Sequence, residues 1–218
     1  MPPLRVLIKE NRAYFICLLL LFIPATFIYL NYTMAEGFYL LNPYHNDLIT
    51  KFFIVLTLFG DGLFCIAVGL ILFFFNQRYL SILVLSSYLL SGLIAQVLKY
   101  FIIEARPAIY LHDSNYKYFI NAVTLHNYHG FPSGHTASIF ALVTILTLVL
   151  KLKSAGLLLL FIAVLVGYSR IYLGEHFMID VLCGAVIGII SAIACLYFFN
   201  DNNIFFKKRF NYSPSNSK

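Results

Sequence analysis

Six long apolar stretches constrain this chain more than any other feature of its sequence. They cover residues 14–30, 52–75, 79–103, 136–150, 157–172 and 177–199. Most of them approach the roughly 20 apolar residues that a helix needs to cross a bilayer. The runs are continuously apolar, whereas barrel strands alternate in shorter segments, so helices are favoured. The sequence predicts an all-α polytopic membrane protein: a six-transmembrane-helix bundle over residues 1–200, followed by a polar cytoplasmic tail over residues 201–218.

The composition supports a membrane protein and excludes several other classes. Hydrophobic residues make up 61% of the 218 residues and charged residues only 11%, whereas soluble domains have about 45–50% and about 25%. A soluble enzyme or a disordered chain is therefore excluded. The net charge of +6 does not indicate nucleic acid as a partner, because the charges lie between apolar runs.

The distribution of basic residues predicts the orientation. With the N-terminus inside, ten Lys and Arg residues fall in the cytoplasmic segments and five on the opposite side. Cytoplasmic loops carry an excess of Lys and Arg, so both termini are expected to face the cytoplasm. The first apolar stretch is long for a signal peptide and is expected to remain as a span.

Two cations lie close to the end of the third apolar stretch. Lys99 and Arg106 are two helical turns apart and would share a face if the helix continued that far. Pro107 disfavours helical geometry at Arg106, so the helix is expected to break there. By themselves, the two residues fit cations that extend to the lipid headgroups just as well.

The fourth stretch opens with Ser133, Gly134 and His135. Ser133 is a candidate N-cap, and Gly134 allows the backbone to approach a ligand closely. A helix N-terminus presents free N–H groups to an anion, and His135 beside it is suited to transfer a proton. An ordinary helix cap with an interfacial histidine is the alternative.

The third group consists of Arg170, His176 and Asp180. His176 and Asp180 are expected on one helix face, at the i,i+4 spacing that allows a hydrogen bond. A carboxylate bonded to one ring nitrogen makes the other a better base or nucleophile. A purely structural His–Asp pair is the alternative, although ionisable groups inside apolar spans usually have a function.

Together the three groups indicate phosphoryl chemistry, because all of them map to one predicted side of the membrane. Cations and backbone N–H groups stabilise a phosphoryl group during transfer. One histidine can attack phosphorus while the other protonates the departing oxygen. No carboxylate cluster suited to Mg²⁺ accompanies them, so neither a metal nor another cofactor is expected.

These residues also carry a resemblance to a known family. Lys99-x6-Arg106-Pro107, Pro132-Ser133-Gly134-His135 and Ser169-Arg170-x5-His176-x3-Asp180 match the three signature motifs of the type 2 phosphatidic acid phosphatase family. The motifs lie within residues 99–180, and every defining position is present.

The resemblance implies a metal-independent lipid phosphatase that forms a phosphohistidine. On this basis His176 is the nucleophile, Asp180 orients it and His135 is the general acid. The phosphate-binding residues would be Lys99, Arg106, Ser133, Gly134 and Arg170.

We therefore expect a lipid phosphate or pyrophosphate substrate in the bilayer, with the active site at the outer face of a bacterial inner membrane and no obligate protein partner. Undecaprenyl pyrophosphate is preferred as substrate over phosphatidylglycerophosphate, phosphatidic acid and lipid A, because compact chains of this kind resemble bacterial members. Nothing in the residues separates these headgroups. A phosphotransferase and a non-catalytic lipid-phosphate transporter or binding protein are the rival functions.

Several polar residues keep more than one interpretation. Asp61 either pairs with a cation or caps a break in the second span. Glu104 and Glu175 either tune the motif residues or form local salt bridges. His126 and His129 are interpreted as solvated or capping side chains and not as metal ligands.

Overall fold

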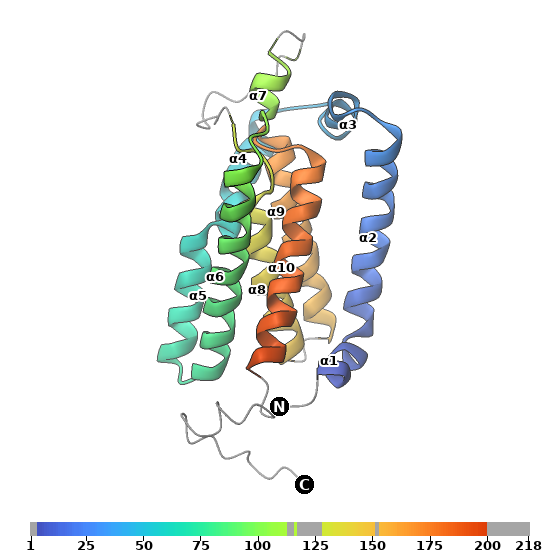
Figure 1. The fold of residues 1–218 in the computed structure, drawn as a ribbon. Coiled ribbons are helices and arrows are strands. Elements are labelled where there is room, and N and C mark those ends of the chain that lie inside the picture. The colour runs from blue at the N-terminus through green and yellow to red at the C-terminus, as the bar shows by residue number, and fades with distance from the viewer. Residues whose placement is uncertain (1–3, 113–115, 117–127, 151–152, 200–218) are drawn as a thin grey trace.

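The computed structural model describes residues 4–112, 116, 128–150 and 153–199, and every regular element within them is a helix (Figure 1). In chain order the helices are α1 (Leu4–Glu10), α2 (Arg12–Asn31), α3 (Met34–Leu41), α4 (Asp47–Thr57), η1 (Leu58–Gly60), α5 (Gly62–Phe74), α6 (Arg78–Phe101), α7 (Pro107–Tyr110), α8 (Gly134–Val149), α9 (Lys153–Tyr172) and α10 (Met178–Phe198). The predicted tail, residues 201–218, lies outside the described residues.

The helices confirm an all-α protein that is integral to a membrane. Within the described ranges, α2, α6, α9 and α10 are long and apolar enough to cross a bilayer, and the α4–α5 pair makes a fifth candidate. The remaining predicted span, α8, has only 16 residues. At 1.5 Å per residue it measures about 24 Å, less than the roughly 30 Å of a bilayer core. Six complete crossings therefore remain a prediction.

The predicted second span, 52–75, is not one continuous helix, which corrects the expectation from sequence. α4 begins earlier, at Asp47, and the chain bends by 54° between η1 and α5. Asp61 lies at the bend with an extended backbone, and its Oδ1 accepts a hydrogen bond from the N–H of Leu63 at 2.9 Å. This bond caps the new helix, so of the two roles left open for Asp61 the structure shows the cap.

α8 forms the centre of the bundle, because 12 of its residues are buried. α10 packs against it through Gly184 and Gly188, where a Cβ atom would lie 2.5 Å from the Ser133 carbonyl oxygen and 2.4 Å from that of Ala137. Such small residues let two membrane helices approach closely. The contact brings the first turns of α8 and α10 together at one end of the bundle.

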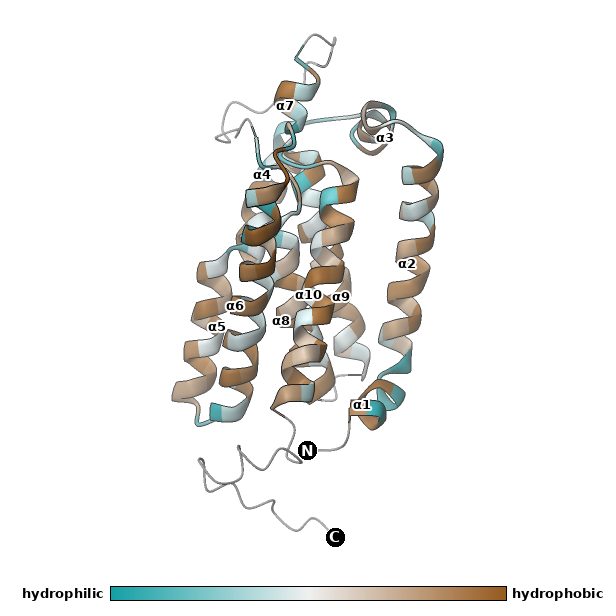
Figure 2. Cartoon of the chain, in the orientation of Figure 1, coloured by the Kyte–Doolittle hydropathy of each residue, from teal (hydrophilic) through white to brown (hydrophobic). Residues whose placement is uncertain are grey.

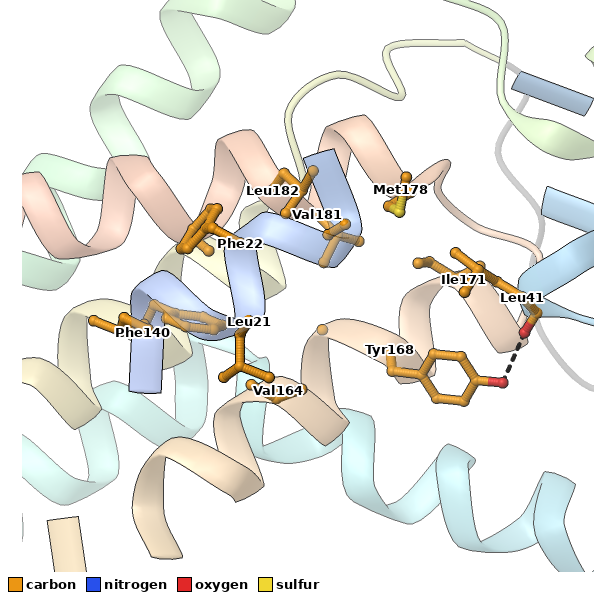
Figure 3. Close-up of a pocket in the computed structure, with 14 residues that line it drawn as sticks. Leu21, Phe22, Leu41, Phe140, Val164, Tyr168, Ile171, Met178, Val181 and Leu182 are labelled. Carbon is orange, nitrogen blue, oxygen red and sulfur yellow. Dashed lines mark hydrogen bonds between the residues drawn. The ribbon is translucent and has the colours of Figure 1, made fainter. Parts of the chain in front are cut away.

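α2 is packed less closely than the other long helices and lies to one side of α9 and α10 (Figure 1). Figure 2 shows that α2, α5 and α6 are hydrophobic over most of their length, as expected for helices that face lipid. A cavity of about 230 Å³ separates α2 from α8, α9 and α10. Its lining is almost entirely apolar, and the Tyr168 hydroxyl closes one end by donating to the Leu41 carbonyl at 2.7 Å (Figure 3).

Candidate active site

The predicted site residues gather at the end of the bundle where α6 and α9 finish and α8 and α10 begin. The close packing of α8 on α10 produces the first link, because the Ser133 N–H donates to the Asp180 carbonyl at 3.0 Å. Gly130 provides a second link: a Cβ on it would lie 3.3 Å from Cγ of Arg106 and 3.6 Å from Oδ2 of Asp180. Residues from all three sequence motifs therefore lie within one small region.

His176 and Asp180 form a buried pair, with side chains 3% and 1% exposed and 3.3 Å between Nδ1 and Oδ2. The pair was predicted, but its helical basis was wrong because α10 begins only at Met178. His176 lies in the preceding turn, and Asp180 Oδ2 also accepts the N–H of Phe177 at 2.9 Å. The carboxylate thus bonds to the chain just before the helix and holds the ring there.

Burial, followed by the charges of Arg170, Arg106 and Lys99, lowers the pKa of His176 well below its usual value. The imidazole is therefore neutral near pH 7. With Nδ1–H donating to Asp180, Nε2 carries the free lone pair. A neutral nitrogen in this setting is a competent nucleophile.

The N-terminus of α8 faces open space. Ser133 is the N-cap, and its Oγ accepts hydrogen bonds from the Thr136 N–H and hydroxyl at 3.4 and 2.9 Å. A Cβ on Gly134 would meet no atom within 4 Å. The predicted Ser133 cap is present, the space beside Gly134 is open, and His135 follows on the first turn.

His135 lies against the broken second span. A Cβ on Gly60 would lie only 3.0 Å from Cβ of His135 and 2.8 Å from Cγ1 of Val166. The bend at Asp61 therefore brings η1 into the site. The sequence did not indicate that η1 belongs to the site, because only the Gly60-Asp61-Gly62 pattern marks it.

Arg106 and Arg170 reach the site from different elements. As predicted, α6 ends before Arg106, at Phe101, and Arg106 has an extended backbone preceding Pro107 at the start of α7. The Arg106 guanidinium forms an ion pair with Glu175, and Arg170 Nη2 lies 3.7 Å from the same Glu175 oxygen. Of the roles left open for Glu175, the structure shows the salt bridge, although this bridge joins distant segments.

Thr57, at the end of α4, was not identified from the sequence. Its hydroxyl accepts a hydrogen bond from Nη1 of Arg170 at 2.7 Å. A threonine in an apolar helix carries no distinctive signal, so this contact could be found only from the structure. It fixes one end of the guanidinium.

Lys99 is tied to the segment that precedes α8. Its Nζ donates to the His129 carbonyl at 2.6 Å, and the His129 ring Nδ1 lies 2.8 Å from the Lys99 carbonyl. His129 thus caps the end of α6, one of the roles expected for it. His126 lies outside the described residues. Glu104 accepts the Gly130 N–H at its backbone oxygen, 3.3 Å away.

The arrangement as a whole suits a tetrahedral anion. Three cations and a helix N-terminus supply positive potential, and Nε of Arg170 is a buried donor with no partner in the described part of the chain. A neutral histidine backed by a carboxylate adjoins these cations. Such a site can bind a phosphoryl group and attack it.

Comparison with known proteins gives related sequences and a related structure. The family model described as the PAP2 superfamily matches residues 80–204. Phosphatidylglycerophosphatase B of Bacillus subtilis is 32% identical over 57% of this chain, and undecaprenyl-diphosphatase of Sulfolobus acidocaldarius is 29% identical over 55%. The matches span 61% and 55% of those two proteins, less than two thirds of either.

Among solved structures, Aquifex aeolicus LpxE superposes with a TM-score of 0.67 and 34% identity, over 76% of this chain and 96% of that one. The family match covers more than half of the chain and includes every residue of the three motifs. The chain therefore belongs to the PAP2 superfamily, the type 2 phosphatidic acid phosphatase family that its motifs resemble.

Proposed function

We propose that this chain is a lipid phosphatase that hydrolyses a phosphate monoester or pyrophosphate on a lipid headgroup through a phosphohistidine. The main support is the buried His176–Asp180 pair, because anion binding alone needs cations but no activated imidazole. The names of the two curated relatives, a phosphatidylglycerophosphatase and an undecaprenyl-diphosphatase, are consistent with this reaction.

In the first step, Nε2 of His176 forms a bond to phosphorus while the bond to the leaving oxygen breaks. Asp180 holds the Nδ1–H and stabilises the positive charge that develops on the ring. His135 donates its proton to the leaving oxygen. The leaving group is a lipid alcohol for a monoester and a lipid monophosphate for a pyrophosphate.

In the second step, water attacks the phosphorus and the N–P bond breaks, which releases inorganic phosphate. His135, now without its proton, takes one from the water and returns to its starting state. Lys99, Arg106, Arg170 and the N–H groups at Ser133 and Gly134 stabilise the charge on the phosphoryl oxygens in both steps. Side chains and backbone N–H groups of this protein supply every function in this scheme.

The proposed substrates are undecaprenyl pyrophosphate, phosphatidylglycerophosphate, phosphatidic acid and the phosphates of lipid A. The first of these is preferred for a bacterial inner membrane, and the loop over residues 104–131 is proposed to shape headgroup selectivity. In each case the hydrocarbon tail stays in the bilayer while the phosphate enters the site.

Phosphate release by detergent-purified protein in excess EDTA, measured with all four lipids, tests this function. His176→Ala and His135→Ala are expected to lose activity by orders of magnitude. His45→Gln is the matched control, because this histidine stacks on Tyr172 at 4.1 Å between ring centroids and bonds to Asn42 outside the site. An active His176→Ala would overturn the mechanism, and turnover only with a second acceptor would identify a phosphotransferase.

The proposed outer-face location has a separate test. Tyr110, on α7 at the site end of the bundle, is 51% exposed. Tyr110→Cys in intact cells is expected to react with a membrane-impermeant maleimide. Labelling only after the cells are lysed would place the site on the cytoplasmic side.

A further inference from the structure

Glu175 is a buried carboxylate for which the proposed mechanism has no role. Its side chain is only 2% exposed. One oxygen, Oε2, is paired with Nη1 of Arg106 and lies 3.7 Å from Nη2 of Arg170. Arg106 Nη1 also donates to the Glu175 backbone carbonyl at 3.4 Å. A single residue therefore contacts both arginines of the candidate site.

The physical effect of this carboxylate is to hold two like charges together. Two guanidinium groups in a poorly solvated region repel each other. A carboxylate between them offsets this repulsion, and its removal would leave uncompensated buried charge. Planar guanidinium groups also bond in fixed directions, so the contact fixes orientation as well as distance.

The same turn of chain also positions the proposed nucleophile. The N–H groups of Glu175 and His176 both donate to the Arg170 carbonyl, at 3.0 and 3.1 Å. Gly174 supplies the left-handed backbone that this turn needs, with φ of 73°. Any displacement of Glu175 would therefore be transmitted to the backbone of His176.

The contacts of Arg170 leave one donor available. Nη1 bonds to Thr57 and Nη2 faces Glu175, whereas the buried Nε has no partner in the described residues. A carboxylate that occupied the place of the phosphate would be expected to accept a hydrogen bond from this Nε. Glu175 instead lies nearest to Nη2, at 3.7 Å, so the Nε–H has no acceptor among the described residues and remains available to a ligand.

We propose that Glu175 is a positioning residue that sets the separation and direction of the Arg106 and Arg170 guanidinium groups for a tetrahedral phosphoryl group. The inference rests on the proposed function for its kinetic consequences, whereas its consequences for anion binding do not require turnover. The competing interpretation is that the Glu175 carboxylate itself occupies the place of the phosphate and so competes with it for the two arginines.

The test compares Glu175→Ala and Glu175→Gln with wild type by kcat, KM, the inhibition constant of inorganic phosphate and the unfolding temperature. Glu175→Ala is expected to lose about 100-fold in kcat/KM, the scale of a 1 Å misplacement, and to bind phosphate about tenfold more weakly. Glu175→Gln is expected to recover about tenfold of the loss, because its amide oxygen still accepts from Arg106.

The matched control is Glu36→Gln, which alters a carboxylate outside the candidate site, at the start of α3, where it accepts from the N–H of Thr33 at 2.9 Å. It is expected to retain the phosphate affinity and kcat/KM of wild type. If Glu175→Ala does not fold, Glu175→Gln decides the question: a weaker phosphate affinity at unchanged unfolding temperature supports positioning.

Two results would overturn the proposal. Tighter phosphate binding in both Glu175 variants would identify an internal competitor. A lower unfolding temperature with unchanged kinetic constants would identify a purely structural salt bridge. If wild type itself released no phosphate, the proposed function would fail, but binding of inorganic phosphate measured by ³¹P NMR would still test the positioning role.

Discussion

The two sides of the α9–α10 pair differ sharply in chemistry. On one side Arg170 and Asp180 belong to the charged site, whereas their chain neighbours Ile171 and Val181 line the apolar cavity beside α2. Successive residues of a helix point about 100° apart. Two helices therefore present a polar surface on one side and an apolar surface on the other, and a shift of one residue would exchange them.

The boundary between the two sides is a close contact of three helices. A Cβ on Gly167 of α9 would lie 3.0 Å from Cγ1 of Val181 on α10 and 3.5 Å from Cγ2 of Thr136 on α8. This contact lies between the apolar cavity and the charged site.

The largest effect is expected from neighbouring substitutions on either side of the boundary. Asp180→Asn removes the carboxylate that orients His176 and should lower kcat by about 10²- to 10⁴-fold, the range of acid–base contributions. Val181→Ala, one residue further on, should change kcat by less than about threefold because its side chain faces the cavity. Equal losses in the two variants would contradict the division into two sides.

A charge placed in the cavity tests whether that side is dry. Val181→Asp should destabilise the protein by at least about 1–3 kcal/mol, the cost of leaving a buried polar group without a partner, which is larger for a charged group. Thermal unfolding in detergent measures the effect, with Val181→Ala as the reference for lost packing. An unchanged unfolding temperature would show that water or another polar group solvates the cavity.

The boundary itself can be tested with a smaller change. Gly167→Ala places a methyl group 3.0 Å from Val181 and should destabilise the protein by about 1 kcal/mol through overpacking. Adding Val181→Ala removes the opposing methyl groups, so the double variant should recover part of that loss. Strictly additive losses in the free energy of unfolding, measured in a double-mutant cycle, would mean that the two residues are not in close contact.

The last expected effect is on the dependence of stability on pH. Because the pKa of His176 is lowered in the fold, the unfolded chain binds a proton there that the folded chain does not, below about pH 6.5. Its contribution to the free energy of unfolding is constant above that pH and falls below it, by at most about 1.4 kcal/mol per unit. Between pH 7 and 5.5 wild type should lose more in unfolding temperature than His176→Gln. Parallel losses would indicate a solvated, ordinary histidine.

The sequence was sufficient to predict the helical class, the break before Pro107 and the Ser133 cap. These features depend on local chemistry: apolar run length, the restriction that proline imposes, and a hydroxyl before a helix. The sequence did not decide the role of Asp61, because a carboxylate between two glycines is compatible with either a cap or an ion pair. The backbone conformation at the bend was needed to decide between these two roles.

The candidate site was predicted residue by residue but not in its contacts. His176 was placed on α10, although it lies in the turn before it, because i,i+4 spacing cannot reveal where a helix starts. Glu175 and Arg106 are far apart in the chain and meet only through tertiary packing. The roles of these residues in catalysis remain predictions.

The central position of α8 has a consequence for the membranes in which this protein can work. A span that is too long or too short for its bilayer tilts or strains, at a cost that grows with the mismatch. α8 carries His135 just after its N-cap, Ser133, and has most of its residues buried in protein, while α2, α5 and α6 present apolar side chains outward. Changes in bilayer thickness act first on those outer helices, so the geometry around His135 should be buffered against differences in lipid length.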